Sequence, residues 1–141
     1  MTAASPALPG DMAGAIRDRS PAATATIVVC RTCRGAGAGD GAALLAAAGE
    51  LAAAAGGAVA VRGVACLANC RRGLSAAISA PGAWSYVFGD LTAAGAADLV
   101  AGAALLAASA DGTMPWRGRP EALKRGLIAR IPSPENLTEV P

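Results

Sequence analysis

Four cysteines are the residues in this sequence whose type and spacing point to chemistry. They form two pairs, Cys30–Cys33 and Cys66–Cys70, separated by a gap of 32 residues. Cysteine thiolates are nucleophiles, redox groups and ligands for zinc and iron. The chain of 141 residues has no histidine, which excludes a Ser-His or Cys-His catalytic pair and any histidine-liganded metal site. A metal centre built here is therefore expected to be all-thiolate.

The elements predicted around the two pairs bring them together. The β-branched run Thr24–Cys30 predicts a strand, and Gly41–Ala55 predicts a helix capped by Asp40. A second strand over Ala58–Ala65 leads directly into Cys66. Because a strand–helix–strand unit makes its strands parallel, both cysteine loops leave from the same edge of the sheet. The four thiols are therefore expected to converge.

The elements that follow complete the predicted fold. Strands are expected over Leu74–Ala80 and Trp84–Phe88, joined by a turn at Pro81-Gly82. A helix is expected over Ala93–Ala108, and a short one over Glu121–Ala129. The order predicts an α/β protein with the thioredoxin-like arrangement, βαβ followed by ββα, in which helices flank a mixed sheet.

The chain divides into three predicted segments. Residues 1–23, rich in Pro, Ala and Gly, are expected to be a flexible N-terminal tail. Residues 24–112 form the thioredoxin-like domain that carries the cysteines, and residues 113–141 form a basic C-terminal extension. Within the domain, Asp90 or Thr92 is expected to cap the second helix. Trp84, Tyr86 and Phe88 alternate along one strand, so they share a face that lies in the core or at an interface.

Composition limits both the core and the partners. With 39 alanines and 18 glycines, the core is expected to be thin, and a metal centre that ties two loops would stabilise it. A net charge of +2, from 12 basic and 10 acidic residues, gives no indication of nucleic-acid or membrane binding. No secretory signal or spanning segment is evident. We expect a bacterial-style cytoplasmic protein whose thiols stay reduced.

Three chemistries compete for the four cysteines. A 2Fe-2S cluster needs four thiolates around an elongated core, which two pairs on two loops suit. Zinc also accepts four thiolates. A thiol–disulfide oxidoreductase would use Cys30 and Cys33, but this leaves Cys66 and Cys70 unexplained, and Gly73 stands where such enzymes place a proline. We favour a non-enzymatic electron carrier that holds a 2Fe-2S cluster.

Charged and polar residues surround the cysteines. Four arginines flank the thiols: Arg31, Arg34, Arg71 and Arg72. They are interpreted as offsetting the negative charge of a cluster, raising its reduction potential and docking an acidic redox partner, or as solvated loop residues. Asn69, Gly35 and Gly73 are expected to act through backbone amides near the sulfurs, or simply as turn residues.

The C-terminal extension carries a concentration of positive charge. The segment Trp116–Ile131 has a local net charge of +4. It is expected either to bind a partner or an anionic ligand, or to pack across the edge of the sheet with its arginines in solvent.

Several motifs resemble a known family. They are Val29–Cys33, Cys66–Ser75, Pro81–Leu91 and Pro115–Glu121. Together they resemble an uncharacterised bacterial family usually labelled predicted metal-binding protein, over about Thr26 to Pro132, and that family in turn resembles thioredoxin-like 2Fe-2S ferredoxins.

The resemblance carries its own implications. It implies Cys30, Cys33, Cys66 and Cys70 as cluster ligands and suggests a homodimer. In those ferredoxins the first cysteine pair is usually more widely separated than here, which keeps zinc or a metal-handling module open. Members of the family are often associated with cobalt or cobalamin genes.

Overall fold

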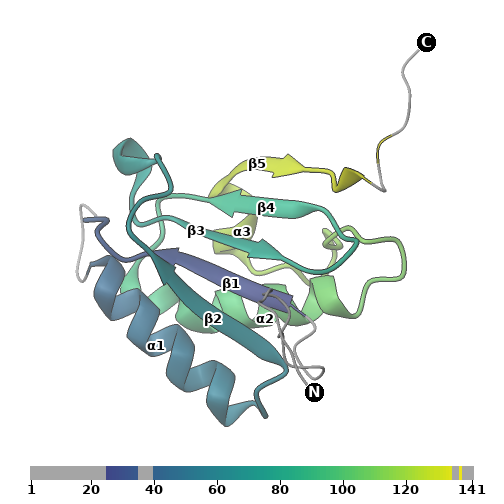
Figure 1. The fold of residues 1–141 in the computed structure, drawn as a ribbon, viewed down its shortest axis with the longest axis horizontal. Helices are drawn as coiled ribbons and strands as arrows, with labels where there is room; N and C mark the ends of the chain where they lie inside the picture. Colours follow the sequence, from purple (N-terminus) through teal and green to yellow (C-terminus); the bar gives the residue numbers. More distant parts are fainter. Residues whose placement is uncertain (1–24, 35–39, 135–136, 138–141) are drawn as a thin grey trace, which may run out of the picture.

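The structure centres on a five-stranded mixed sheet with the strand order β2-β1-β3-β4-β5 (Figure 1). It is a computed structural model that describes residues 25–34, 40–134 and 137. The tail predicted over residues 1–23 and the predicted turn glycines 35, 37 and 39 lie outside the described residues. Two strands pair in parallel, β1 (Ala25–Cys30) and β2 (Val59–Val64). The other pairings are antiparallel and involve β3 (Ala76–Ser79), β4 (Ser85–Phe88) and β5 (Leu127–Ile131).

Three helices accompany the sheet: α1 (Gly41–Ala54), α2 (Ala96–Ala107) and α3 (Glu121–Arg125). Two short 3-10 turns, η1 (Cys70–Arg72) and η2 (Ala93–Gly95), lie between them. Helices α1 and α2 contact each other and both pack on β1, so they cover the same face of the sheet (Figure 1). The mixed α/β fold predicted from the sequence is confirmed.

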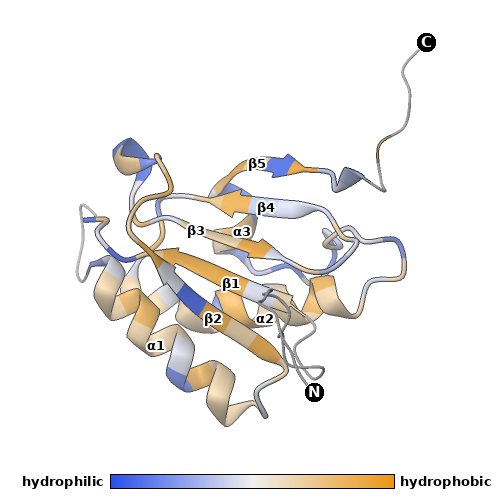
Figure 2. Ribbon diagram, in the orientation of Figure 1, coloured by the Kyte–Doolittle hydropathy of each residue, from blue (hydrophilic) through white to orange (hydrophobic). Residues whose placement is uncertain are grey.

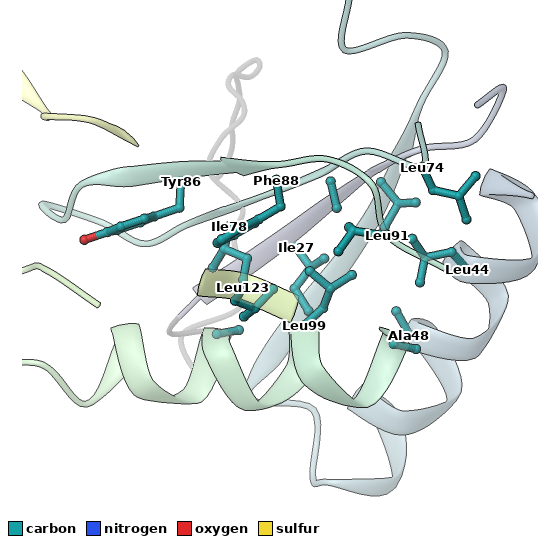
Figure 3. Packing of buried hydrophobic residues seen from close by; sticks show 14 of the residues in the cluster. Ile27, Leu44, Ala48, Leu74, Ile78, Tyr86, Phe88, Leu91, Leu99 and Leu123 are labelled. Atoms are coloured by element: carbon teal, nitrogen blue, oxygen red, sulfur yellow. The ribbon is translucent and has the colours of Figure 1, made fainter. Parts of the chain in front are cut away.

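The core lies between this face of the sheet and the helices. Ile27 and Val29 of β1 are fully buried, whereas Thr26 and Val28 on the opposite face are half-buried. Hydrophobic residues run along β1 and α2, and hydrophilic ones gather at η1 (Figure 2). Side chains from the sheet, from α2 and from α3 meet in one cluster (Figure 3). Its largest fully buried members include Tyr86, Phe88, Ile27, Ile78, Leu99 and Leu123.

The aromatic strand supplies much of this core. The rings of Tyr86 and Phe88 stack with their centroids 6.3 Å apart, and both residues are buried. The Tyr86 hydroxyl accepts a hydrogen bond of 2.8 Å from the backbone N–H of Met114, so its buried oxygen is satisfied. The core position predicted for these two residues is confirmed, while Trp84 at the start of the strand is only half-buried.

The helix ends show where the sequence patterns succeed and fail. Asp40 caps α1 as predicted, because its carboxylate accepts the Ala43 N–H at 3.0 Å. The second helix begins with the turn η2, and neither Asp90 nor Thr92 caps it. That prediction is wrong because the 3-10 turn separates both residues from the first turn of α2.

The helix predicted over Glu121–Ala129 is wrong beyond Arg125. Gly126 ends α3, and the run Leu127–Ile131 forms β5 instead. It pairs with β4, with Val87 opposite Ala129, and thereby satisfies the backbone of β4 on its outer side. Part of the predicted C-terminal extension therefore belongs to the same sheet as the cysteine-bearing strands.

A glycine in α2 allows α3 to approach closely. A Cβ added at Gly102 would collide with the side chain of Leu123 and lie 3.3 Å from Ile78 Cδ1. Leu123 is fully buried, so it has little room to move. Small residues therefore bring the elements of this thin core into contact.

Two glycine-to-alanine changes test this close approach. In Gly102→Ala, overpacking is expected to cost about 1–3 kcal/mol, while the gain in helix propensity is at most about 1 kcal/mol. The net stability should therefore fall. Gly49 in α1 has open space around its Cβ position, so Gly49→Ala should raise stability by about 0.5–1 kcal/mol. Urea midpoints that move in the same direction for both variants would contradict this account.

Candidate metal centre

The two cysteine loops leave from the same edge of the sheet. In the parallel register of β1 and β2, Cys30 lies opposite Val64. Cys30 ends its strand, and Cys66 follows two residues after Val64. The prediction that both cysteine loops leave from the same edge of the sheet is confirmed by this register (Figure 1).

The first pair is buried beneath the loops. Cys30 is 1% exposed and Cys33 is 4% exposed. Cys30 Sγ lies 3.7 Å from Thr32 Oγ1 and 3.8 Å from the carbonyl oxygen of Ala65. The Thr32 hydroxyl also donates to Ala65, so it links the first cysteine loop to the second. Gly73 lies against the pair, because a Cβ at this position would be 3.3 Å from Cys33 Sγ.

The second pair lies at the surface. Cys66 and Cys70 are both exposed. The backbone N–H of Ala68 donates to Cys66 Sγ at 3.1 Å, while Ala68 itself has a positive φ of 61°. Cys70 begins the 3-10 turn η1. One pair is therefore shielded and the other is accessible from solvent.

The thiols of each pair interact with each other. Burial raises the pKa of Cys30, but hydrogen bonds from the Cys33 side chain and the Leu67 backbone outweigh this and lower it overall. Burial and the hydrogen bond to Cys30 raise the pKa of Cys33 to about 11. The hydrogen bond with Cys66, followed by Coulomb repulsion from it, raises the pKa of Cys70. Within the first pair, the negative charge is therefore favoured on Cys30 over Cys33.

The two pairs also interact with each other electrostatically. Coulomb repulsion between Cys70 and both Cys30 and Cys33 contributes to the raised pKa values of Cys33 and Cys70. Within the described residues, no three Cys, Asp or Glu side chains converge closely enough to hold a metal ion as they are placed. All four candidate ligands are nevertheless sulfur atoms, and they form two pairs with a hydrogen bond within each pair. This arrangement fits a metal group in which each metal ion binds two thiolates.

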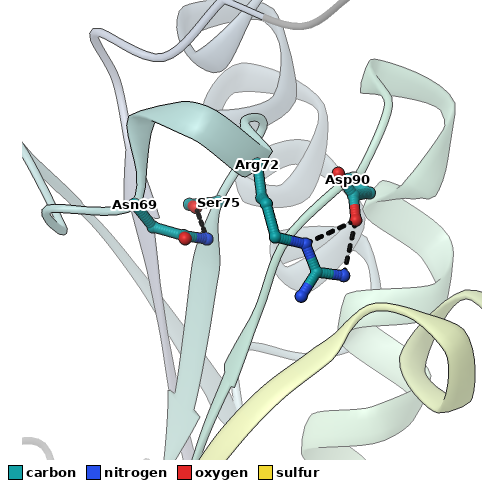
Figure 4. A network of polar contacts seen from close by, with 4 residues as sticks. All are labelled: Asn69, Arg72, Ser75 and Asp90. Carbon is teal, nitrogen blue, oxygen red and sulfur yellow. Dashed lines mark hydrogen bonds and ion pairs between the residues drawn. The ribbon is translucent and has the colours of Figure 1, made fainter.

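Four arginines flank the two loops, and one of them has an ion-pair partner among the residues that the structure describes. Arg31, Arg34 and Arg71 are exposed. Arg72 donates through Nε (2.8 Å) and Nη2 (2.6 Å) to one carboxylate oxygen of Asp90 (Figure 4). Asp90 is the sole ion-pair partner of these four arginines among the residues that the structure describes. The other three keep their charge available near the thiols.

Asn69 fixes the second loop through its side chain. Its amide nitrogen donates at 2.6 Å to the hydroxyl of Ser75, which is fully buried (Figure 4). The backbone of Ser75 also hydrogen-bonds toward Cys33. Backbone donors to the sulfurs come from Leu67 and Ala68, residues that the sequence did not single out. Their position inside the tight loop between Cys66 and Cys70 was the available signal.

The architecture identifies the class of fold. The protein is similar to a thioredoxin-like [2Fe-2S] ferredoxin from Aquifex aeolicus, with a TM-score of 0.53 and 13% sequence identity, over 82% of this chain and 99% of the ferredoxin chain. A crystal structure of the wild-type Aquifex aeolicus thioredoxin-like [2Fe-2S] ferredoxin gives a TM-score of 0.49 and 13% identity, over 76% of this chain and 98% of that one. The thioredoxin-like fold predicted from the order of elements is confirmed.

The family follows from the sequence match. Residues 27–133 match the DUF1636 family, described as a protein of unknown function, and the chain belongs to this family. The resemblance inferred from the cysteine motifs is thereby confirmed. A comparison with curated proteins finds no match. In the described part of the chain, no helix has the length and apolar character needed to cross a bilayer.

A double-mutant cycle tests which contact holds the second cysteine loop. Asn69→Ala and Ser75→Ala, alone and combined, should show a coupling of about 1–2 kcal/mol because the hydrogen bond involves a buried hydroxyl. The Arg72–Asp90 pair is exposed, so the cycle of Arg72→Ala with Asp90→Ala should give well under about 1 kcal/mol. Urea unfolding under reducing conditions measures both. A larger coupling for the ion pair would contradict this ranking.

Proposed function

We propose that this protein binds a 2Fe-2S cluster through Cys30, Cys33, Cys66 and Cys70 and carries single electrons to an acidic partner protein. The observation that carries the proposal is the arrangement of the thiols in two hydrogen-bonded pairs at one edge of the sheet. A 2Fe-2S core is elongated and takes one pair of thiolates on each iron. Two pairs on two neighbouring loops supply that ligand set.

The fold supports the same reading. The Aquifex aeolicus protein that shares this fold is named a thioredoxin-like [2Fe-2S] ferredoxin. Its chain is covered almost completely, at 99%, so the likeness extends over the whole scaffold and not one motif. Because the sequence identity is only 13%, the cofactor of this protein has to be tested with variants of its own four cysteines.

The residues around the thiols suit a redox centre. A bound cluster would supply reversible one-electron chemistry. Backbone donors from Leu67 and Ala68 stabilise negative charge on the sulfurs of Cys30 and Cys66. The exposed pair, Cys66 and Cys70, places two ligands where a partner protein reaches them. Electrons would therefore enter and leave through the second loop.

The exposed arginines indicate the charge of the partner. Arg31, Arg34 and Arg71 lie on the two cysteine loops without a carboxylate partner among the described residues. Positive charge around a redox centre attracts an acidic protein surface and accelerates its association. The same charge favours the reduced cluster, which is more negative than the oxidised one, and so raises the reduction potential.

A thiol–disulfide enzyme is the second candidate, because the lowered pKa of Cys30 is typical of a nucleophilic thiolate. However, Cys30 and Cys33 are only 1% and 4% exposed, so a protein disulfide has no access to them. The accessible pair is Cys66 and Cys70. The alternative metal is zinc, held by the same four thiolates in a metal-handling module of the bacterial cytoplasm. The metal content of the purified protein distinguishes this alternative from a 2Fe-2S cluster.

Metal and sulfide content tests the proposal. Anaerobically purified protein, or protein reconstituted with iron and sulfide, should be red-brown and contain about two irons and about two acid-labile sulfides per chain. Its visible absorption should bleach with dithionite. Single Ser substitutions at the four cysteines should each remove or change this spectrum, whereas Thr32→Ser keeps its hydroxyl and should leave the spectrum intact.

Two results would overturn the proposal. One is colourless protein that holds about one zinc and takes up no iron and sulfide. The other is reduction of insulin disulfides that survives Cys66→Ser, which would assign the chemistry to Cys30 and Cys33.

The arginine contribution predicts a shift in the reduction potential. Arg71→Glu reverses an exposed charge one residue from Cys70, so it should lower the midpoint potential and slow electron transfer to an acidic partner about tenfold at low salt. Arg62→Glu makes the same charge change on β2 and is the matched control. Equal potentials and equal rates for both variants would remove the electrostatic role of Arg71.

A further inference from the structure

A second cationic surface lies away from the cysteine loops. We name it the Trp116 patch and define it as Trp84, Trp116, Arg119, Lys124 and Arg130. Trp84 precedes β4, and β4 runs in the same direction as β1, so Trp84 lies at the end of the sheet opposite to Cys30. Figure 1 shows the segment between α2 and α3 turned away from the cysteine loops.

Cations cover the aromatic rings of the patch. The Arg130 guanidinium lies 4.6 Å from the centroid of the Trp84 ring. Arg119 and Lys124 lie 5.2 Å and 4.9 Å from the centroid of the Trp116 ring. Contacts of this kind fix the positions of the positive groups, since cation–π attraction holds each one against a ring. The patch is therefore an ordered set of cations and not a group of free side chains.

Arg119 is the fixed centre of the patch. It is only 8% exposed, and it lies over the Tyr86 ring at 5.5 Å as well as over Trp116. Its guanidinium donates to the carbonyl oxygens of Met114 and Pro115. Burial, together with repulsion from Arg130, lowers its pKa. A positive charge is thus held at a desolvated position beside a second one.

No carboxylate balances this charge within the described residues. Glu121, the acidic residue of the segment Trp116–Ile131, is bound by Arg125 at 2.9 Å, and Arg125 lies outside the patch. Two guanidinium groups and one ammonium group are therefore left together. Like charges at close range destabilise each other unless an anion joins them.

We propose that the Trp116 patch is a docking surface for an acidic protein segment, whose carboxylates pair with Lys124 beside the Trp116 ring and with Arg130 beside the Trp84 ring. Trp116 is 61% exposed although it is a large aromatic residue, which is typical of an anchor that a partner covers. Tryptophan and arginine are the residue types that contribute most to protein interfaces.

The geometry favours carboxylates over nucleic acid. Single-stranded nucleic acid binds by stacking its bases on open aromatic faces along a basic groove. Here cations already lie on the faces of both tryptophans. The net charge of the whole chain, +2, also gives little attraction for a phosphate backbone. The patch thus fits a compact group of carboxylates.

This inference does not rest on the proposed cluster. The Trp84 end of the patch lies at the end of the sheet opposite to Cys30, so a partner that binds there leaves Cys66 and Cys70 accessible. The surface is therefore suited to tether the protein to an acidic segment while the cysteine centre acts on another molecule.

Binding of a labelled acidic peptide tests the proposal. Fluorescein-labelled hexaglutamate is titrated with the full-length protein at about 50 mM salt, where charge interactions are weakly screened, and its fluorescence anisotropy is measured. We expect saturable binding that weakens as salt is raised. Arg130→Glu and Lys124→Glu should each reduce the affinity about tenfold, and Trp116→Ala at least about threefold.

A matched variant controls for net charge. Arg62 and Arg130 are both exposed arginines on edge strands, β2 and β5, so Arg62→Glu changes the charge equally on the other edge of the sheet. It should change the affinity less than about twofold. Equal loss in both variants, or no binding by the unaltered protein, would overturn the proposal. Competition by inorganic phosphate or an oligothymidylate at lower concentration than hexaglutamate would also overturn it, since the patch would then bind phosphate groups.

Discussion

The parallel pairing of β1 with β2 is the constraint on which the cysteine centre depends. It sets Cys30 opposite Val64, so the loops that carry the two cysteine pairs start side by side. A slip by one residue would turn Cys30 to the opposite face of the sheet, where the helices pack. Helix α1 makes the parallel pairing possible by crossing between the strands, and Thr32 then joins the first loop to Ala65 in the second. Every function considered for the four thiols depends on this placement of the two loops.

The elements that local patterns predict are those whose sequences agree with their surroundings. The β-branched run of β1 and the capped helix α1 form where expected, because propensity, capping and burial all favour the same structure. Strand β5 is not predicted by its local sequence. The short run Leu127–Ile131 continues a helical stretch in sequence, and only the open edge of β4 determines that it becomes a strand. Such an edge is a property of the folded sheet and has no local signal.

The same distinction applies to the site. The spacing of the cysteines and the order of the elements were sufficient to predict that the two cysteine loops start side by side. They did not predict the positions of the thiols, of which no three in the described residues lie closely enough to hold a metal ion. The contacts that hold the second loop were not predictable in this way. Asp90 reaches Arg72, and Ser75 reaches Asn69, because the antiparallel strands β3 and β4 bring their ends to the cysteine edge. The local sequence around Asp90 predicts a helix cap because it contains no sign of its distant partner, Arg72.

Although the net charge of the chain is only +2, its basic residues form two cationic surfaces, the arginines of the cysteine loops and the Trp116 patch. The carboxylates that the structure describes near them are engaged locally: Arg72 holds Asp90, and Arg125 holds Glu121. Hydrogen bonds from the hydroxyls of Thr113 and Ser109 hold the pKa of Asp111 at about 2. Strand β4 alone spans about 13 Å, whereas charges in solvent are screened beyond about 8 Å at physiological salt. The arginines of the cysteine loops and the Trp84 end of the Trp116 patch lie at opposite ends of β4 and therefore attract acidic surfaces independently.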